Sequence, residues 1–304
     1  MAHTSATSRP ITPLHAPSTH STTAPFPSIL DRPSKLLSVV APAYNEAERI
    51  EVFLDDIIAY LSDVQVTKPS FTWEIIIVDD GSRDNTVSIA HKYMLDHGAD
   101  AVRVLKLACN HGKGGAVRKG MLRARGKYIL MADSDGATAA HEVSSLLAEL
   151  ERIEEDGQGI AVGSRAHLQN AKDGKAAARS PLRILLMKSF HLLLHVCMGN
   201  AGSIDDTQCG FKMFTRDTAA ALFSNLHIQR WAFDVELFVL AGILGNIPMV
   251  EVPVEWNEIP GSKVDLLWDS LKMARDLLTI RLAYSTGLWK LQPLKRNLAK
   301  SKSS

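Results

Sequence analysis

Short apolar runs alternate along the chain with stretches in which apolar residues recur every three or four positions. An apolar run is typical of a buried strand, and the longer spacing is typical of a helix with one buried face. Strands are expected at 36–42, 73–78, 102–107, 127–132 and 160–163. Helices are expected at 50–61, 84–97 and 141–155, with another that follows a glycine-rich turn and ends near Arg125. This alternation predicts an α/β fold, a doubly wound and mostly parallel sheet with helices on both faces.

The pattern is weaker after residue 165. Leu182 to Met198 is apolar but carries Arg183, Lys188, His191 and His195. It is interpreted either as an amphipathic helix in a bilayer interface or as a core helix with one wet face. A short strand after Gly210, a helix near 234–244, a strand at 247–256 and an amphipathic helix at 265–282 are expected to follow.

Three regions differ in composition. Residues 1–35 are rich in Ser, Thr, Pro, His and Ala and have no apolar period, so a disordered tail is expected, with a transit peptide as the alternative. Residues 36–260 are expected to form one α/β domain. Residues 261–304 are expected to form a C-terminal amphipathic, interfacial helical segment with a basic tail.

Composition excludes several classes of protein. A 46% hydrophobic content over 304 residues is enough for a large core. The net charge of +1 gives no general attraction for nucleic acid, so no nucleic-acid partner is expected. The three cysteines form no CxxC pair, which argues against a disulfide framework or a zinc site. No run of 18 uninterrupted apolar residues indicates a spanning helix.

Acidic clusters follow two of the apolar runs. Asp79 and Asp80 end the run that begins at Trp73, and Asp133-Ser134-Asp135 follows the run that ends at Met131. The carboxyl ends of parallel strands form the ligand-binding edge of such a sheet. Alternate residues of an extended segment point the same way, so Asp133 and Asp135 present two carboxylates to one point. This pattern predicts Mg²⁺ or Mn²⁺ held against a substrate diphosphate. For Asp79 and Asp80, a turn and capping role is the alternative.

Two further segments contribute polar groups to this edge. Pro42, Tyr44 and Glu46 follow the first strand, where they can contact a base or ribose; capping of the next helix is the alternative reading of Asn45 and Glu46. Lys113 lies among glycines, whose backbone can approach phosphate or sugar closely. The loop lacks the spacing of a P-loop, which disfavours an ATPase.

These motifs together resemble a known family. Asp133-Ser134-Asp135 resembles the DxD motif of GT-A glycosyltransferases, and Tyr44 to Glu46, Val78 to Ser82 and Gly112 to Arg118 resemble family 2 of those enzymes. Within that family, the runs 206–212 and 230–236 are similar to those of dolichyl-phosphate β-glucosyltransferases. The resemblance implies transfer of glucose with inversion from UDP-glucose to dolichyl phosphate, which yields the lipid-linked glucose donor for protein N-glycosylation.

The resemblance also implies a cellular site. These enzymes act at the endoplasmic reticulum membrane, with the catalytic domain on the cytosolic face. They usually begin with a membrane-spanning helix, and residues 1–35 show none. Peripheral or monotopic attachment is therefore expected, through segments 181–199 and 265–290.

The resemblance assigns roles to individual residues. The metal, Mg²⁺ or Mn²⁺, is expected on Asp133 and Asp135. The nucleotide sugar is expected to contact Pro42, Tyr44, Glu46, Asp79, Asp80, Lys113, Asp133 and Ser134. Catalytic positions are Asp133, Asp135, Arg165 and Asp234, the last without an assigned role. A phosphate acceptor is already anionic near neutral pH and needs cationic positioning rather than a general base. The residues expected to supply it are Arg165, Arg179, Lys212 and Lys263.

Other functions stay open at the sequence level. The alternative within the enzyme class is a dolichyl-phosphate mannosyltransferase that uses GDP-mannose, or another family 2 enzyme with a prenyl-phosphate acceptor. Outside it, the alternative is a noncatalytic nucleotide-sugar-binding module, although a pure binder has no need of an intact metal-binding pair. The sequence leaves the oligomeric state open.

Overall fold

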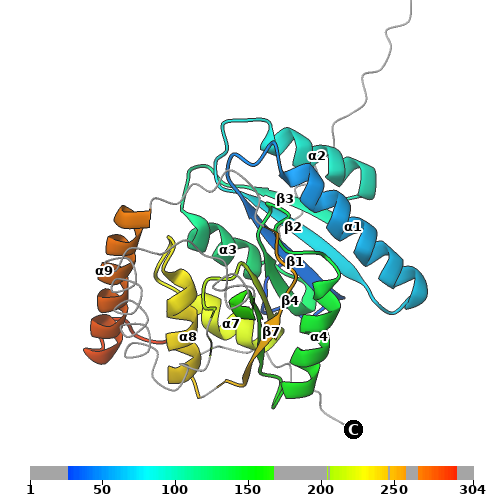
Figure 1. Ribbon diagram of the computed structural model, residues 1–304. Helices are drawn as coiled ribbons and strands as arrows, with labels where there is room; N and C mark the ends of the chain where they lie inside the picture. Colours follow the sequence, from blue (N-terminus) through cyan, green and yellow to red (C-terminus); the bar gives the residue numbers. More distant parts are fainter. Residues whose placement is uncertain (1–26, 168–203, 205, 246, 258–265, 293–304) are drawn as a thin grey trace, which may run out of the picture.

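One seven-stranded sheet forms the centre of the structure, a computed structural model that describes residues 27–167, 204, 206–245, 247–257 and 266–292 (Figure 1). The strands lie in the order β3-β2-β1-β4-β6-β5-β7. Their bounds are β1 Lys35–Ala43, β2 Trp73–Asp79, β3 Val102–Lys106, β4 Gly126–Ala132, β5 Ile160–Ser164, β6 Phe211–Thr215 and β7 Met249–Pro253. The five strands expected before residue 165 are all confirmed.

Strand direction confirms a mostly parallel sheet. β1 pairs in parallel with β2 and β4, β2 with β3, and β5 with β7. β6 lies between β4 and β5 and is antiparallel to both. Because it runs in the opposite direction, its first residue, Phe211, pairs with Ala132, the last residue of β4. The loop before β6 therefore reaches the same edge as the carboxyl ends of the parallel strands.

Helices cover both faces of this sheet, as expected (Figure 1). Their bounds are α1 Ile50–Thr67, α2 Thr86–His97, α3 Lys113–Met121, α4 Glu142–Ile153, α7 Arg216–Asn225, α8 Phe233–Ile243 and α9 Leu266–Ser285. The helix expected to end near Arg125 ends at Met121. The pattern did not indicate α7. Residues on all sides of that short helix are buried, so its sequence does not alternate between buried and exposed positions.

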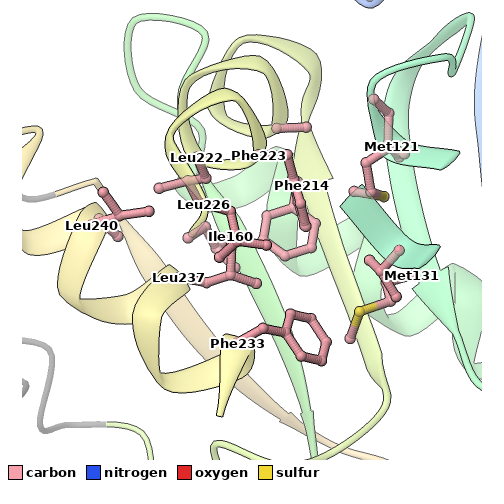
Figure 2. Close-up of a cluster of buried hydrophobic side chains, with 14 of the residues drawn as sticks. Met121, Met131, Ile160, Phe214, Leu222, Phe223, Leu226, Phe233, Leu237 and Leu240 are labelled. Atoms are coloured by element: carbon pink, nitrogen blue, oxygen red, sulfur yellow. The ribbon is translucent and has the colours of Figure 1, made fainter. Parts of the chain in front are cut away.

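The core has two halves, one on each face of the sheet. On one face, α1, α2 and α4 contribute to a cluster with strand residues such as Val39 and Leu130. On the other, α3, α7, α8 and α9 pack against strand residues such as Val40 and Met131. Figure 2 shows part of this second cluster, in which Phe214 of β6 lies beside Phe223 of α7, their ring centres 5.4 Å apart. Alternate strand residues thus bury both faces.

The folded domain begins earlier than the expected boundary at residue 35. Ile29 is buried in the core. The guanidinium of buried Arg216 donates hydrogen bonds to the carbonyl oxygens of Ser28 and Asp31, at 3.1 and 2.9 Å. Ile29 and the backbone of Ser28, Asp31 and Ser34 thus contact the domain, although they belong to the segment expected to be a disordered tail.

The C-terminal helix α9 presents two different faces. Leu277 and Ile280 are buried against the body of the protein, whereas Leu278 and Leu282 are exposed. Tyr284 and Trp289 also pack inward, around His227. Among the described residues, no helix combines the length and apolar character that crossing a bilayer requires. The basic segment 182–198, Arg179 and Lys263 lie outside the described residues.

Candidate active site

Two carboxylates stand at the carboxyl end of β4. Asp133 and Asp135 are half-buried, while Ser134 between them is buried and donates a hydrogen bond from Oγ to the carbonyl oxygen of Pro42, at 2.8 Å. One oxygen of Asp135 accepts the Ala137 N–H at 3.0 Å. The alternation of buried and half-buried residues agrees with the expectation that both acids point to one side. The hydrogen bond from Ser134 to Pro42 fixes this segment to the end of β1.

Lys113 forms an ion pair with the first of these acids. Its Nζ lies 2.7 and 2.9 Å from the two carboxylate oxygens of Asp133. Burial lowers the pKa of Lys113, but the charges of Asp133 and Asp234 outweigh it and hold that pKa above its ordinary value. The sequence predicted Lys113 at a phosphate, and the structure brings its ammonium to Asp133 of the acidic pair, where it offsets part of the negative charge.

Asp80 fixes the glycine loop that precedes Lys113. Its two carboxylate oxygens accept the backbone N–H groups of His111 and Gly112, at 2.7 and 2.8 Å. Burial raises the pKa of Asp80, and these hydrogen bonds act in the opposite direction. Asp79 accepts the N–H of Ser82 at 3.2 Å. Both acids thus serve the loop geometry, the alternative raised from the sequence, and their contact with the nucleotide stays a prediction.

The segment after β1 lies at the same edge. Tyr44 is 37% exposed. The N–H of Glu46 donates to Thr86 Oγ1 at 2.8 Å, and the Glu46 carboxylate accepts from Arg49 Nε at 2.7 Å. The N-cap of α1 is Arg49, and no side chain caps that helix end. Side-chain capping by Asn45 or Glu46 is therefore not what this structure contains, and their contact with a nucleoside stays a prediction.

The loop before β6 touches the acidic pair directly. The N–H of Asp133 donates to the carbonyl oxygen of Gly210 at 3.1 Å. A Cβ on Gly210 would overlap the carboxylate of Asp133. Glycine is therefore required here to leave room for a carboxylate rather than to permit a special backbone angle. The position of Asp133 depends on a residue 77 positions later in the chain.

Lys212 occupies a different place from the one expected. Its side chain is 0% exposed, its Nζ lies 2.6 Å from Asp234 Oδ1, and it also donates to the carbonyl oxygen of Cys209. An ammonium that is fully buried and paired in this way does not lie open to an acceptor phosphate. The expectation of direct phosphate binding by Lys212 is corrected: the residue lies behind the site surface, where it balances the charge of Asp234.

Asp234 lies in the first turn of α8, close to Lys212 and Lys113. Burial raises the pKa of its carboxyl, and the charges of Lys212 and Lys113 oppose that effect. Its neighbour Glu236 belongs to the framework: it is fully buried and accepts the N–H groups of His227 and Ile228, at 2.9 and 2.6 Å. The structure thus brings Asp234 into the site and keeps Glu236 out of it.

Arg165 follows β5 and faces the loop before β6. Its Nε and one terminal nitrogen donate to the two oxygens of Asp206, at 2.7 and 2.9 Å. Its guanidinium lies 5.4 Å from the ring centre of Trp256. Burial alone raises the pKa of Asp206, but the hydrogen bonds and charge of Arg165 hold it below its ordinary value. Arg165 is held in a fixed position, and its contact with an acceptor phosphate stays a prediction.

Sequence reasoning missed one aromatic residue at the site. Trp231 is 42% exposed, and Lys113 Nζ lies 5.9 Å from its ring centre. The residue stands in the run Arg230 to Glu236 that carried part of the family resemblance. The available signal was its position next to a predicted helix start. A single tryptophan shows no periodic pattern, so the sequence does not tell whether it belongs to the site or to the core.

The donor set at this edge fits a divalent ion such as Mg²⁺ or Mn²⁺. Asp133 and Asp135 offer hard oxygen ligands, the type these ions prefer. Within the described ranges, no group of three His, Cys, Asp or Glu side chains is arranged to hold a metal. Asp133 and Asp135 are the candidate ligands at this edge among the described residues, and the oxygens of a diphosphate are ligands of the same hard type.

Comparisons with known proteins agree with this geometry. The glycosyl transferase family 2 model matches residues 38–216. A Drosophila melanogaster protein named dolichyl-phosphate beta-glucosyltransferase is 49% identical over 276 residues, covering 90% of this chain and 83% of that protein. The human protein of that name is 48% identical, with 89% and 82% covered, and the Saccharomyces cerevisiae protein is 42% identical, with 84% and 76% covered.

Solved structures show the same fold at low sequence identity. Glucosyl-3-phosphoglycerate synthase from Mycobacterium tuberculosis, in complex with UDP, has a TM-score of 0.56 at 18% identity, covering 82% of this chain and 80% of that one. Mannosyl-3-phosphoglycerate synthase from Rubrobacter xylanophilus has a TM-score of 0.57 at 18% identity, with 86% and 77% covered. This likeness supports the fold alone.

Fold, acidic edge and family match together define a GT-A glycosyltransferase, and the chain belongs to glycosyl transferase family 2. Relatives that are 42 to 49% identical over most of its length identify its group within that family. Within family 2, the chain belongs with the dolichyl-phosphate β-glucosyltransferases.

Proposed function

We propose that this enzyme transfers glucose from UDP-glucose to dolichyl phosphate with inversion, which gives dolichyl β-D-glucosyl phosphate, the lipid-linked glucose donor for protein N-glycosylation. The observation that carries the proposal is the pair of carboxylates, Asp133 and Asp135, at the carboxyl end of β4. Lys113 forms an ion pair with Asp133. The names of the relatives support both the sugar and the acceptor.

On the donor side, Asp133 and Asp135 would hold Mg²⁺ or Mn²⁺. When bound, the ion supplies positive charge that stabilises the departing diphosphate. A solved M. tuberculosis relative in fold is in complex with Mn²⁺ and UDP-glucose, which is consistent with this chemistry. Lys113 adds a charged ammonium beside the diphosphate, and Tyr44 and Glu46 contact the nucleoside from the end of β1.

On the acceptor side, the phosphate of the lipid attacks the anomeric carbon. Because this phosphate is anionic near neutral pH, no side chain has to remove a proton. Arg165 directs its guanidinium to the phosphate while Asp206 holds it in orientation. Arg179 and Lys263 are proposed as further phosphate contacts. Asp234 acts through charge: it pairs with Lys212 and raises the pKa of Lys113.

The enzyme meets its lipid substrate at the cytosolic face of the endoplasmic reticulum membrane. Support comes from the outer face of α9, where Leu278 and Leu282 are exposed, and from Leu288, which follows the helix. Apolar side chains on an amphipathic helix enter the bilayer interface. Leu277, Tyr284 and Trp289 lie within the segment 265–290, which was expected to be interfacial, but they face the protein body and are left out of this surface.

The donor is tested by transfer assays with purified full-length protein, dolichyl phosphate and Mg²⁺. UDP-glucose and GDP-mannose are offered separately and then in competition. With labelled UDP-glucose, we expect a labelled lipid product that separates from free UDP-glucose on extraction into organic solvent. Transfer from GDP-mannose alone contradicts the donor assignment and identifies the mannosyltransferase alternative. Binding of UDP-glucose with no transfer to any prenyl phosphate identifies the noncatalytic alternative.

A further inference from the structure

A partly exposed tryptophan lies beside Lys113, the lysine that pairs with Asp133. Trp231 precedes α8, is 42% exposed and lies 5.9 Å, ring centre to Nζ, from Lys113, which is itself 2.7 Å from Asp133. Other exposed large apolar residues, such as Leu95 on α2 and Val66 on α1, lie on helices of the opposite face of the sheet. An indole left open to solvent at the reaction centre offers a flat apolar surface to a ligand.

The backbone that carries Trp231 is tightly held. The N–H of Gly115 donates to the carbonyl oxygen of Gln229 at 2.9 Å. A Cβ on Gly114 would lie 2.7 Å from Phe233 Cβ and 2.9 Å from the carbonyl oxygen of Ile228, so the glycine loop is pressed against this segment.

Buried Glu236 fixes the same segment from behind. It accepts the Ile228 N–H at 2.6 Å and the hydroxyl of Tyr284 at 2.7 Å. The backbone segment that carries Trp231 is therefore fixed relative to Lys113 and Asp133 before any ligand binds. This lowers the entropy cost of binding.

We propose that Trp231 is the platform for the hexose of the donor, a specificity-determining residue that packs against the apolar face of the sugar ring. This rests on the proposed function, because it takes the Asp133 side to be the diphosphate side. The hexose is bonded directly to the diphosphate, so it must lie within a few ångströms of Lys113, where the indole stands. The lipid chain is separated from this point by the sugar and the acceptor phosphate, which favours the hexose as the occupant.

The test compares two ligands that differ only by the hexose. Dissociation constants for UDP and UDP-glucose are measured with Mg²⁺ on full-length wild type, Trp231→Ala and Trp231→Phe, without acceptor. For Trp231→Ala we expect the Kd of UDP-glucose to rise about tenfold, the scale of one lost aromatic contact, and the Kd of UDP to change less than about twofold. Trp231→Phe keeps an aromatic face and restores most of the affinity for UDP-glucose.

Leu95→Ala serves as the control, since it removes an exposed apolar side chain from a helix on the opposite face of the sheet. Circular dichroism and the thermal midpoint verify that each variant is folded; if Trp231→Ala does not fold, Trp231→Phe against Trp231→Leu replaces it. An equal rise for both ligands, or no rise for either, overturns the proposal. A raised KM for dolichyl phosphate with unchanged binding of UDP-glucose overturns it in favour of the lipid.

The outcome is separable from the donor assignment. If wild type binds GDP-mannose instead of UDP-glucose, the proposed function fails. The same pair of measurements with GDP and GDP-mannose then decides whether Trp231 contacts the hexose.

Discussion

The position of Asp133 depends on the missing side chain of Gly210. The N–H of Asp133 is bonded to the carbonyl oxygen of Gly210, and its carboxylate lies against the glycine Cα. A change at residue 210, which has no proposed ligand contact of its own, therefore acts directly on the Asp133 carboxylate. This makes Gly210 a positioning residue for the reaction.

Gly210→Ala is expected to lower kcat about 100-fold, because its methyl group displaces the Asp133 carboxylate and misplacement by about 1 Å has effects of this size. Steady-state kinetics with UDP-glucose and dolichyl phosphate measure it. Gly242→Ala is the matched control, because a Cβ at this position of α8 meets no atom within 4 Å. Full activity of Gly210→Ala would show that the carboxylate position is not critical.

A second prediction at this scale concerns the pair of Arg165 and buried Asp206. The pKa of Asp206 is lowered in the folded state, so its carboxylate contributes stability above the unfolded value near 3.8 and loses it as pH falls through the folded value. Asp206→Asn is expected to reduce the free energy of unfolding by about 2 kcal/mol at pH 7, since it leaves Arg165 partly unpaired.

Urea unfolding from pH 7 to pH 3 measures this effect. The difference between wild type and Asp206→Asn should shrink as pH falls below 3.8, because the unfolded chain of wild type then binds a proton that its folded state takes up only at lower pH. Asp96→Asn, on the exposed surface of α2, is expected to differ little from wild type at every pH. A constant difference between wild type and Asp206→Asn would refute the linkage.

At the scale of elements, local patterns were enough to locate most strands and helices. The apolar runs before Asp79 and Asp133 coincide with β2 and β4, because a strand buried on both faces is apolar along most of its length. The direction and place of β6 were not predictable, since five buried residues do not encode which strands they pair with.

The limits of prediction at the site have the same origin. The two carboxylates followed from spacing within one strand end. Lys212 looked like a surface cation, but its partner Asp234 is 22 residues away on α8, and only the packing of α8 on the sheet brings them together. Trp231 was missed for a related reason: its closeness to Lys113 depends on the fold of the glycine loop against residues 228–230.

On the scale of the whole molecule, two surfaces differ in character: the sheet edge that carries Asp133 and Asp135, and the outer face of α9. The sheet edge holds the charged donor site, and α9 presents exposed leucines beyond its packed side. The hydroxyl of Tyr284 on α9 donates to Glu236 Oε1 at 2.7 Å, which connects this helix to the segment that carries Trp231. Helix α9, whose outer face is proposed to meet the lipid, is thus joined to the segment beside the proposed active site by a half-buried hydrogen bond.

Membrane binding is expected to depend on this face. The double change Leu278→Asp and Leu282→Asp should reduce the fraction of protein that floats with anionic liposomes, because it places charge where apolar side chains enter the interface. Transfer to a short, water-soluble prenyl phosphate should be largely retained. The matched control is Val66→Asp with Leu95→Asp, two exposed positions on the other face. Equal flotation of both double variants would contradict the role of α9.

The central claim is that Asp133 and Asp135 hold the departing diphosphate, and Asp135→Ala tests it most directly. Its kcat for transfer from UDP-glucose to dolichyl phosphate is measured beside wild type, with the thermal midpoint as the check of folding. The account predicts a loss of ~2 to 4 kcal/mol of transition-state stabilisation, or a fall in kcat of about 30- to 900-fold, at an unchanged midpoint. Full activity in folded Asp135→Ala would contradict it.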